Sequence, residues 1–138
     1  MENMIRSKLT EEENKNFKFL NKSFEEIKLP RTDLIVSNFA LSFCKKNKFE
    51  YVWNEIKNSI RENGYFVGNI FGINEEWNKN EYTFLTKNEV IQILKDFKIV
   101  YFKEKEFEGK TAIGVSKHWH IFYIIAKKIK PYKIRFRW

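Results

Sequence analysis

The sequence predicts an α/β domain with a mostly parallel sheet, helices on both faces and an antiparallel hairpin at the C-terminal end. Three observations support this class. The run of apolar residues from Leu34 to Val36 has the composition of a strand buried on both faces. Segments with strand and helix periodicity alternate through the middle of the chain. Two strand-like segments then follow each other directly, which is typical of a hairpin.

The first part of the chain is predicted to hold one helix and two strands. Residues 2–13 have apolar positions at helical spacing, and residues 17–21 alternate apolar and polar side chains as a strand does. Pro30 leads into the buried strand that starts at Asp33, and Asn38 follows this strand. Open α/β sheets bind ligands at the carboxyl ends of their parallel strands. The alternative is a core strand followed by a buried connection.

Two helices and three strands complete the prediction, and each is marked by its periodicity or its end signals. Asn63-Gly64 is a typical helix end, and Thr86 with Glu89 has the spacing of a capping box. Gly109 is expected to break the first hairpin strand. The predicted segments are a helix over 49–62, a strand over 65–71, a helix over 86–97 and strands over 98–107 and 119–126.

Composition predicts one globular domain in a reducing compartment. The chain has 138 residues, of which 43% are hydrophobic and 17% aromatic, so it can bury a core without covalent links. Cys44 is the only cysteine, which excludes an internal disulfide. No apolar run reaches the roughly 18 residues that a membrane-spanning helix needs. We therefore predict a cytoplasmic protein without a transmembrane segment.

Positive charge is concentrated at the C-terminal end. The formal net charge is +8, and no acidic residue follows Glu108. We divide the chain into a domain over 1–128 and a basic, aromatic tail over 129–138. Basic residues that alternate with aromatic ones can bind nucleic acid weakly or lie on an anionic surface. The alternative is a frayed end without a function.

Five segments, in this order and spacing, resemble the latter part of class I S-adenosylmethionine-dependent methyltransferases of the small-molecule and tellurite-resistance type. They are residues 24–30, 33–41, 62–67, 84–90 and 117–122. The resemblance covers about Met4 to Lys128 and implies a Rossmann-like methyltransferase sheet that lacks its first two strands. Asp33 then opens the fourth strand, residues 64–71 form the fifth, and the hairpin supplies the sixth and seventh.

The resemblance also implies site residues. Ser23 and Phe24 stand where the family has an acidic and a hydrophobic residue near the adenine ring of S-adenosylmethionine. Asn38 and Phe39 match residues that border the methionine end of this cofactor and the methyl acceptor, a small molecule. The candidates on the substrate side are Phe43, Asn69, His118 and His120. Methyl transfer depends mainly on positioning, and no catalytic acid or base is identified.

Two cofactor-binding features of the family are missing from the sequence: the glycine-rich turn after the first strand and the acid after the second. We therefore expect a truncated or split methyltransferase that is inactive alone and needs a companion N-terminal portion or a second copy of itself. Its Asp33 strand would have an exposed edge. The rival hypothesis is a degenerate, basic methyltransferase-like module that binds nucleic acid or a protein partner without catalysis.

Two other motifs have a chemical and a structural interpretation. His118 and His120 form a metal-like pair, but no third ligand completes a site, so we expect packing or a role at the mouth of the substrate site and no metal. Cys44 precedes Lys45-Lys46, which would lower its pKa, or is a small buried residue.

Overall fold

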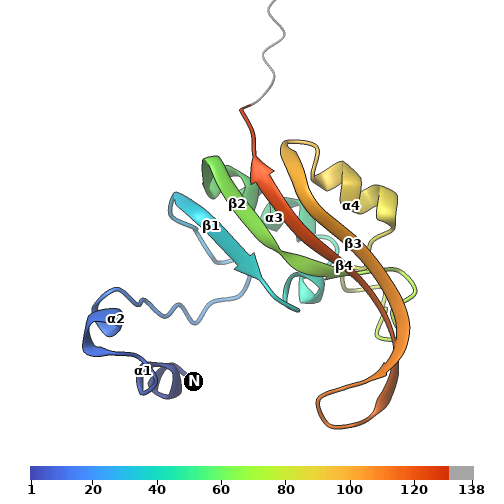
Figure 1. Ribbon diagram of the computed structural model, residues 1–138, viewed down its shortest axis with the longest axis horizontal. Coiled ribbons are helices and arrows are strands. Elements are labelled where there is room, and N and C mark those ends of the chain that lie inside the picture. The colour runs from blue at the N-terminus through green and yellow to red at the C-terminus, as the bar shows by residue number, and fades with distance from the viewer. Residues whose placement is uncertain (131–138) are drawn as a thin grey trace, which may run out of the picture.

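The computed structural model describes residues 1–130, which contain one mixed sheet of four strands. The strands are β1 (Thr32–Ser37), β2 (Ile60–Phe71), β3 (Phe97–Lys110) and β4 (Ser116–Lys128). Their order across the sheet is β1-β2-β4-β3 (Figure 1), with β1 and β2 parallel and the other neighbours antiparallel. This arrangement confirms the predicted α/β class with a C-terminal hairpin.

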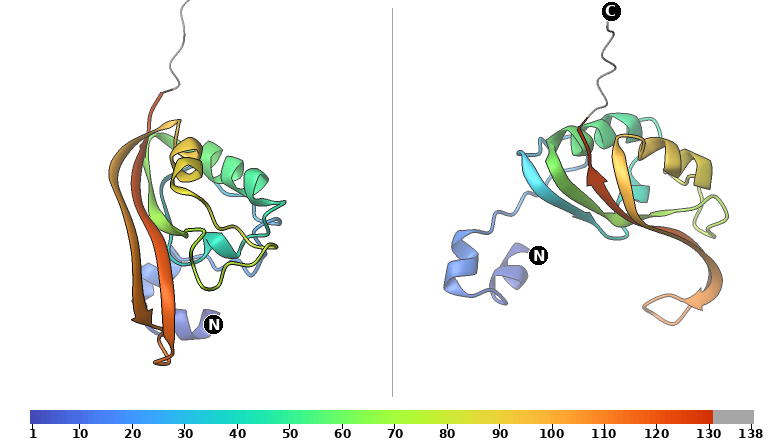
Figure 2. Two further views of the ribbon diagram at one scale, coloured as in Figure 1. Left: turned by 90° about the vertical axis from the view of Figure 1, so that its right-hand side faces the viewer. Right: turned by 45° about the horizontal axis from the view of Figure 1, so that its top comes forward.

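The two longer helices connect the strands and lie on the same face of the sheet (Figure 2). The helices are α1 (Glu2–Arg6), α2 (Glu11–Lys15), α3 (Phe49–Ser59) and α4 (Lys87–Ile93), and a 3-10 turn, η1, spans Leu41–Phe43. In Figures 1 and 2, α1 and α2 lie apart from the sheet. Helices were expected on both faces, but within residues 1–130 helices cover only one face. We call the other the open face.

The main core lies between the covered face and α3 and α4. Trp53 of α3 is buried, and its ring meets Phe66 of β2 edge-on with the ring centroids 5.1 Å apart. The indole Nε1–H of Trp53 also donates a hydrogen bond to the carbonyl of Ile93, at 2.9 Å. This bond satisfies a buried polar group and holds α3 against α4.

Strand β1 forms an edge of the described sheet. Within residues 1–130 it pairs only with β2, so the predicted exposed edge is confirmed. Leu34 and Val36 are 53% and 61% exposed on the open face, whereas Ile35 packs against the main core. The prediction that this strand is buried on both faces is therefore wrong for the described residues. An apolar run indicates a site for burial but not what supplies the covering surface.

Both predicted helices between strands end earlier than expected. Helix α3 stops at Ser59 rather than at residue 62, because the fully buried Ile60 pairs with Thr32 as the first residue of β2. Helix α4 stops at Ile93, and Phe97 begins β3. The predicted capping box of α4 is confirmed, with reciprocal hydrogen bonds of 3.0 and 3.1 Å between Thr86 and Glu89.

The hairpin is longer than predicted at both ends. Gly109 does not break β3, since it remains paired with Lys117 of β4. The turn lies beyond the Lys110 and Ser116 pair, where Gly114 has a φ of 83° that glycine adopts without strain.

The N-terminal segment departs most from its prediction. Residues 2–13 form parts of two short helices instead of one, because Thr10 starts α2 through a capping box with Glu13. Residues 17–21 form no strand. An alternating pattern makes a strand only where another strand offers hydrogen bonds, and within the described residues this segment has no such neighbour.

The ion pair between Lys57 and Asp96 predicts a pH-dependent contribution to stability. Lys57 Nζ lies 2.9 Å from Asp96 Oδ2, and this hydrogen bond is the main cause that lowers the pKa of Asp96. A lowered folded-state pKa stabilises the protein above the unfolded value of about 3.9, and the contribution is lost as pH falls through the folded value. Because the pair is partly exposed, we expect Lys57→Gln to cost less than about 1 kcal/mol at pH 7 and almost nothing near pH 2.

Urea denaturation at the two pH values measures this difference. Lys87→Gln, which changes an exposed lysine of α4, is the matched control. An equal loss at both pH values would contradict the assignment.

Candidate functional site

A buried amide joins the carboxyl ends of β1 and β2. Asn69 of β2 is 4% exposed, and its Oδ1 accepts a hydrogen bond of 2.7 Å from the backbone N–H of Phe39. Its Nδ2 donates a hydrogen bond of 2.7 Å to Asn38 Oδ1. Phe39 has a φ of 50°, a left-handed conformation that costs a residue other than glycine about 1 to 2 kcal/mol. The bonds from Asn69 hold it there, so the fold brings three predicted site residues together.

An apolar groove of about 370 Å³ runs beside β1. Phe24, from the segment before β1, and Asn38, at the end of β1, both line this groove. Ser37 and Glu55 add polar groups to a lining that is otherwise mostly aliphatic. The residue predicted to cover the adenine ring and one predicted near the methionine end therefore border one space.

Ser23 lies in a neighbouring hollow of about 320 Å³, which Phe24, Phe43 and Tyr82 also line. A backbone hydrogen bond, together with one from the Ser23 side chain, lowers the pKa of Glu25. Ser23 thus lies beside Glu25 at this hollow. Its predicted contact with adenine stays a prediction.

Aromatic side chains gather over the end of the open face. Phe71 of β2 is their centre: it is 2% exposed, and its ring centroid lies 5.9 to 6.3 Å from those of five other rings, Phe39, Phe43, Trp77, Phe84 and Trp119. The loop over residues 73–85 contributes Trp77 and Tyr82. We call these residues the aromatic cluster: Phe39, Phe43, Phe71, Trp77, Tyr82 and Trp119.

An ion pair between Lys117 of β4 and Glu75 is buried beside this cluster, with side chains that are 1% and 0% exposed. Lys117 Nζ lies 3.6 Å from the ring centroid of Trp119 and 3.9 Å from that of Trp77, so both rings face an ammonium group. Within residues 1–130, neither Lys117 Nζ nor Glu75 Oε1 has a hydrogen-bond partner beyond this pairing. Burial lowers the pKa of Lys117 to about 8.

Sequence reasoning missed this pair. A signal was present in the alternation of β4. Lys117, Trp119 and Ile121 are every second residue and therefore share one face of the strand, on which the two neighbours of the lysine are large and apolar. Glu75 also fixes the loop to β4, since its Oε2 accepts a hydrogen bond of 2.7 Å from the backbone N–H of His120.

His118 and His120 alternate with Trp119 along β4 and therefore point to the opposite side of the sheet from the aromatic cluster. His120 is 3% exposed; its Nδ1 accepts a hydrogen bond of 3.1 Å from the backbone N–H of Asn74, and its Nε2 lies 2.8 Å from Glu104 Oε2. Its ring is thus held by packing and pairing. A role on the substrate side stays a prediction.

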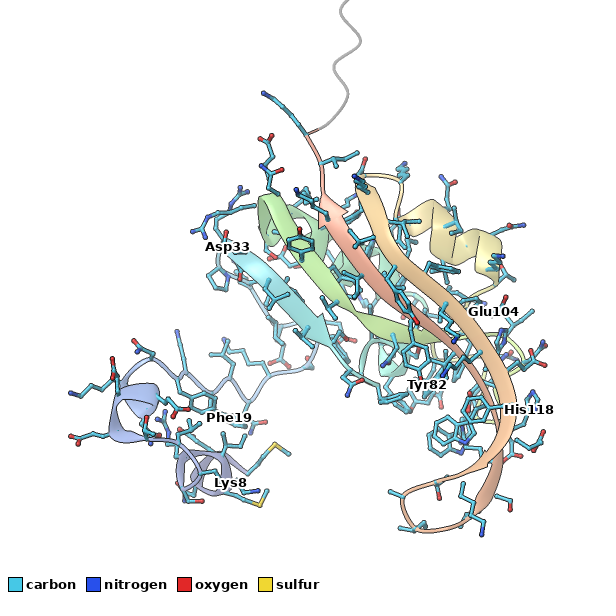
Figure 3. The ribbon with its side chains drawn as sticks, in the orientation of Figure 1. Lys8, Phe19, Asp33, Tyr82, Glu104 and His118 are labelled. Carbon is cyan, nitrogen blue, oxygen red and sulfur yellow. The ribbon has the colours of Figure 1, made fainter. Side chains whose placement is uncertain are left out.

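His118 lies on the curved, lower part of the hairpin (Figure 3) and is paired with two carboxylates. The hydrogen bond with Glu108 is the main cause that raises the pKa of His118, and Glu106, 3.3 Å away, adds to it. Within the described residues, no group of three or more His, Cys, Asp or Glu side chains is arranged to hold a metal ion.

Cys44 is buried, and desolvation raises its pKa. The idea that Lys45-Lys46 activates this thiol is therefore wrong, and the alternative of a small buried residue holds. Among residues 1–130, no helix has both the length and the apolar composition to cross a membrane.

Of the comparisons with known proteins, the one with solved structures gives matches. No family model and no curated protein matches the sequence. TehB from Haemophilus influenzae superposes with a TM-score of 0.66 at 16% identity, covering 85% of this chain and 43% of TehB. A 1,6-didemethyltoxoflavin-N1-methyltransferase from Burkholderia thailandensis superposes with a TM-score of 0.57 at 17% identity, covering 82% and 51% of the two chains. The N-methyltransferase NodS from Bradyrhizobium japonicum superposes with a TM-score of 0.56 at 12% identity, covering 86% of this chain and 65% of NodS.

The fold is that of class I S-adenosylmethionine-dependent methyltransferases. The chain spans less than two thirds of the length of each of these methyltransferases. The assignment of β1 and β2 as the fourth and fifth strands of this fold, and of the hairpin as the sixth and seventh, stays a prediction. Asn38 and Phe39 follow the strand that the sequence resemblance assigned to the cofactor and acceptor end.

Proposed function

We propose that this chain forms the acceptor side of a methyltransferase site, in which a methyl group passes from S-adenosylmethionine to a small molecule. The observation that carries the proposal is the junction of Asn38, Phe39 and Asn69 at the carboxyl ends of two parallel strands. It lies within a methyltransferase fold and beside an apolar groove. One solved neighbour holds S-adenosylhomocysteine and 1,6-didemethyltoxoflavin, which supports a small-molecule acceptor.

The residues present fit one wall of a cofactor site. Phe24, Ser37 and Asn38 offer an aromatic ring, a hydroxyl and a carboxamide to the same groove. The cofactor would supply a methyl group bound to a positively charged sulfur. The task of the chain is then to orient the acceptor in line with that methyl group and to exclude water, for which the aromatic cluster is suited.

The remaining wall is expected to come from polypeptide outside these 138 residues, because the sequence has no glycine-rich turn. The edge of β1 supports this view. Its unpaired backbone groups, the exposed Leu34 and Val36 and the apolar groove together match an added strand that is apolar on both faces.

Calorimetry with S-adenosylhomocysteine tests the proposal. The 138-residue chain alone is expected to show no micromolar binding. Mixing or co-expressing it with a polypeptide that supplies the glycine-rich half, to be sought first in the DNA immediately upstream of its gene, is expected to give micromolar binding. In that complex Asn38→Ala should weaken binding by about tenfold, the effect of one lost hydrogen bond of about 1.4 kcal/mol.

Two results would count against the proposal. Micromolar binding by the chain alone would contradict the need for a second part, and no binding by the assembled complex would contradict the methyltransferase activity itself.

The predicted cytoplasmic location and a dimer of this chain stay predictions. The predicted binding of nucleic acid or an anionic surface rests on the tail over 129–138, most of which lies outside the described residues.

A further inference from the structure

A hollow of about 340 Å³ opens beside the aromatic cluster and is lined by Phe43, Trp77, Lys79 and Tyr82. We call it the aromatic hollow. Phe43 and Trp77 are 44% and 40% exposed, whereas Phe71 and Phe84, also aromatic and close by, are 2% and 7% exposed. Large apolar rings exposed together mark a binding surface more often than single exposed ones do.

Backbone hydrogen bonds hold the rings of the hollow in place. Phe43 belongs to η1, and the loop that carries Trp77 and Tyr82 is tied to the residues around η1. The N–H of Thr83 donates to the carbonyl of Ser42 at 3.0 Å, and its hydroxyl donates to the carbonyl of Cys44 at 2.9 Å. The ring centroid of Phe43 lies 6.5 Å from that of Trp77 and 6.2 Å from that of Tyr82. A flat molecule therefore meets rings whose positions are set before it binds.

The charges around the aromatic hollow favour an anion. Lys79 lines it. Lys117, which lies against the ring of Trp77, adds no net charge because Glu75 pairs with it. The hollow that contains Ser23 shares Phe43 and Tyr82 with the aromatic hollow. Its lining carries two positive charges, on Lys22 and Lys45, and one negative charge, on Glu25. An incoming cation would be repelled by these ammonium groups, while an anionic substituent would be attracted.

We propose that the aromatic hollow binds a planar aromatic molecule with an anionic substituent, its ring against Phe43 and Trp77 and its anionic group at Lys79. The assignment of this molecule as the methyl acceptor rests on the proposed function. Binding itself requires no cofactor.

Calorimetry with three probes tests the ligand class on the chain as it stands. The probe 2-naphthoate has a flat ring and a negative charge, 2-naphthylmethylammonium has the same ring with a positive charge, and cyclohexanecarboxylate has the charge without the flat ring. We expect 2-naphthoate to bind at least about fivefold more tightly than either of the others, as stacking and charge attraction each contribute about 1 kcal/mol.

Two variants locate the site. Lys79→Gln, at an exposed position, is expected to weaken the binding of 2-naphthoate about threefold to tenfold. The same change should not weaken the binding of 2-naphthylmethylammonium. Trp77→Leu is expected to weaken 2-naphthoate binding at least about tenfold. Lys98→Gln and Tyr51→Leu change an exposed lysine and an exposed aromatic residue elsewhere and should have no effect. Circular dichroism checks that each variant is folded.

Equal affinities for the three probes, or affinities unchanged by Lys79→Gln, would overturn the proposal, as would no binding of 2-naphthoate at millimolar concentration. These outcomes are separate from the S-adenosylhomocysteine experiment. Binding of 2-naphthoate without cofactor binding by the assembled complex would leave the aromatic hollow in place and remove its role as an acceptor site.

Discussion

Replacing Glu75 with glutamine is expected to lower the free energy of unfolding by about 3 to 5 kcal/mol at pH 7. The change leaves the ammonium group of Lys117 buried without a counter-charge, between the rings of Trp77 and Trp119. In this variant, Lys117 must lose its proton or remain charged in an apolar site. Its folded-state pKa lies below the unfolded value, so the penalty is present at pH 7 and disappears as pH rises to about 10. Urea denaturation between pH 7 and 10 measures both effects.

The double variant Glu75→Gln with Lys117→Met separates the ion pair from the packing. With both charges removed, most of the loss should be recovered, because a buried pair replaced by apolar groups is often neutral or stabilising. A double variant as unstable as Glu75→Gln alone would show that shape, not charge, sets the cost. A loss below about 1 kcal/mol for the single variant would contradict the assignment of a buried pair.

Gly68→Ala is expected to cost about 2 to 3 kcal/mol, since an added methyl group has no room between β1 and β2. A Cβ atom at Gly68 would collide with the backbone carbonyl of Ser37 and lie 3.0 Å from the ring of Phe66. The carbonyl of Ser37 cannot move without separating the two parallel strands, which pair at this point. The strain would also reach Asn38, the next residue.

Urea denaturation measures this cost, and the amide resonance of Phe39 reports on the strand end. Val36→Ala, on the same strand pair but 61% exposed, is the control and should change stability by about 0.5 kcal/mol or less. A cost for Gly68→Ala as small as that of the control would contradict the close approach of the strands.

Local patterns predicted the elements that lie between β1 and the end of the hairpin. The apolar period of α3, the capping box of Thr86 and the two final strands are all present at about the expected places. These signals work because each depends on neighbours a few residues away. The helix ends were less predictable: Ile60 leaves α3 to pair with Thr32, which is distant in sequence.

The candidate site was predicted in part. Asn38, Phe39 and Asn69 were named from the sequence, and Asn69 joins the other two through its side-chain amide. Lys117 and Glu75 were not named, because a lysine in a sequence is ordinarily read as solvated surface. Only the loop folding back over β4 shows that this lysine is buried.

The sequence by itself determined the α/β class, the C-terminal hairpin and the likeness to methyltransferases, since periodicity and motif order are properties of neighbouring residues. The tertiary structure decided which faces are covered. It leaves Leu34 and Val36 exposed, gives residues 17–21 no strand to pair with, and buries Lys117 against two indole rings. The physical reason is that burial and strand pairing depend on partners from distant parts of the chain, and a local pattern specifies the need for a partner without specifying the partner.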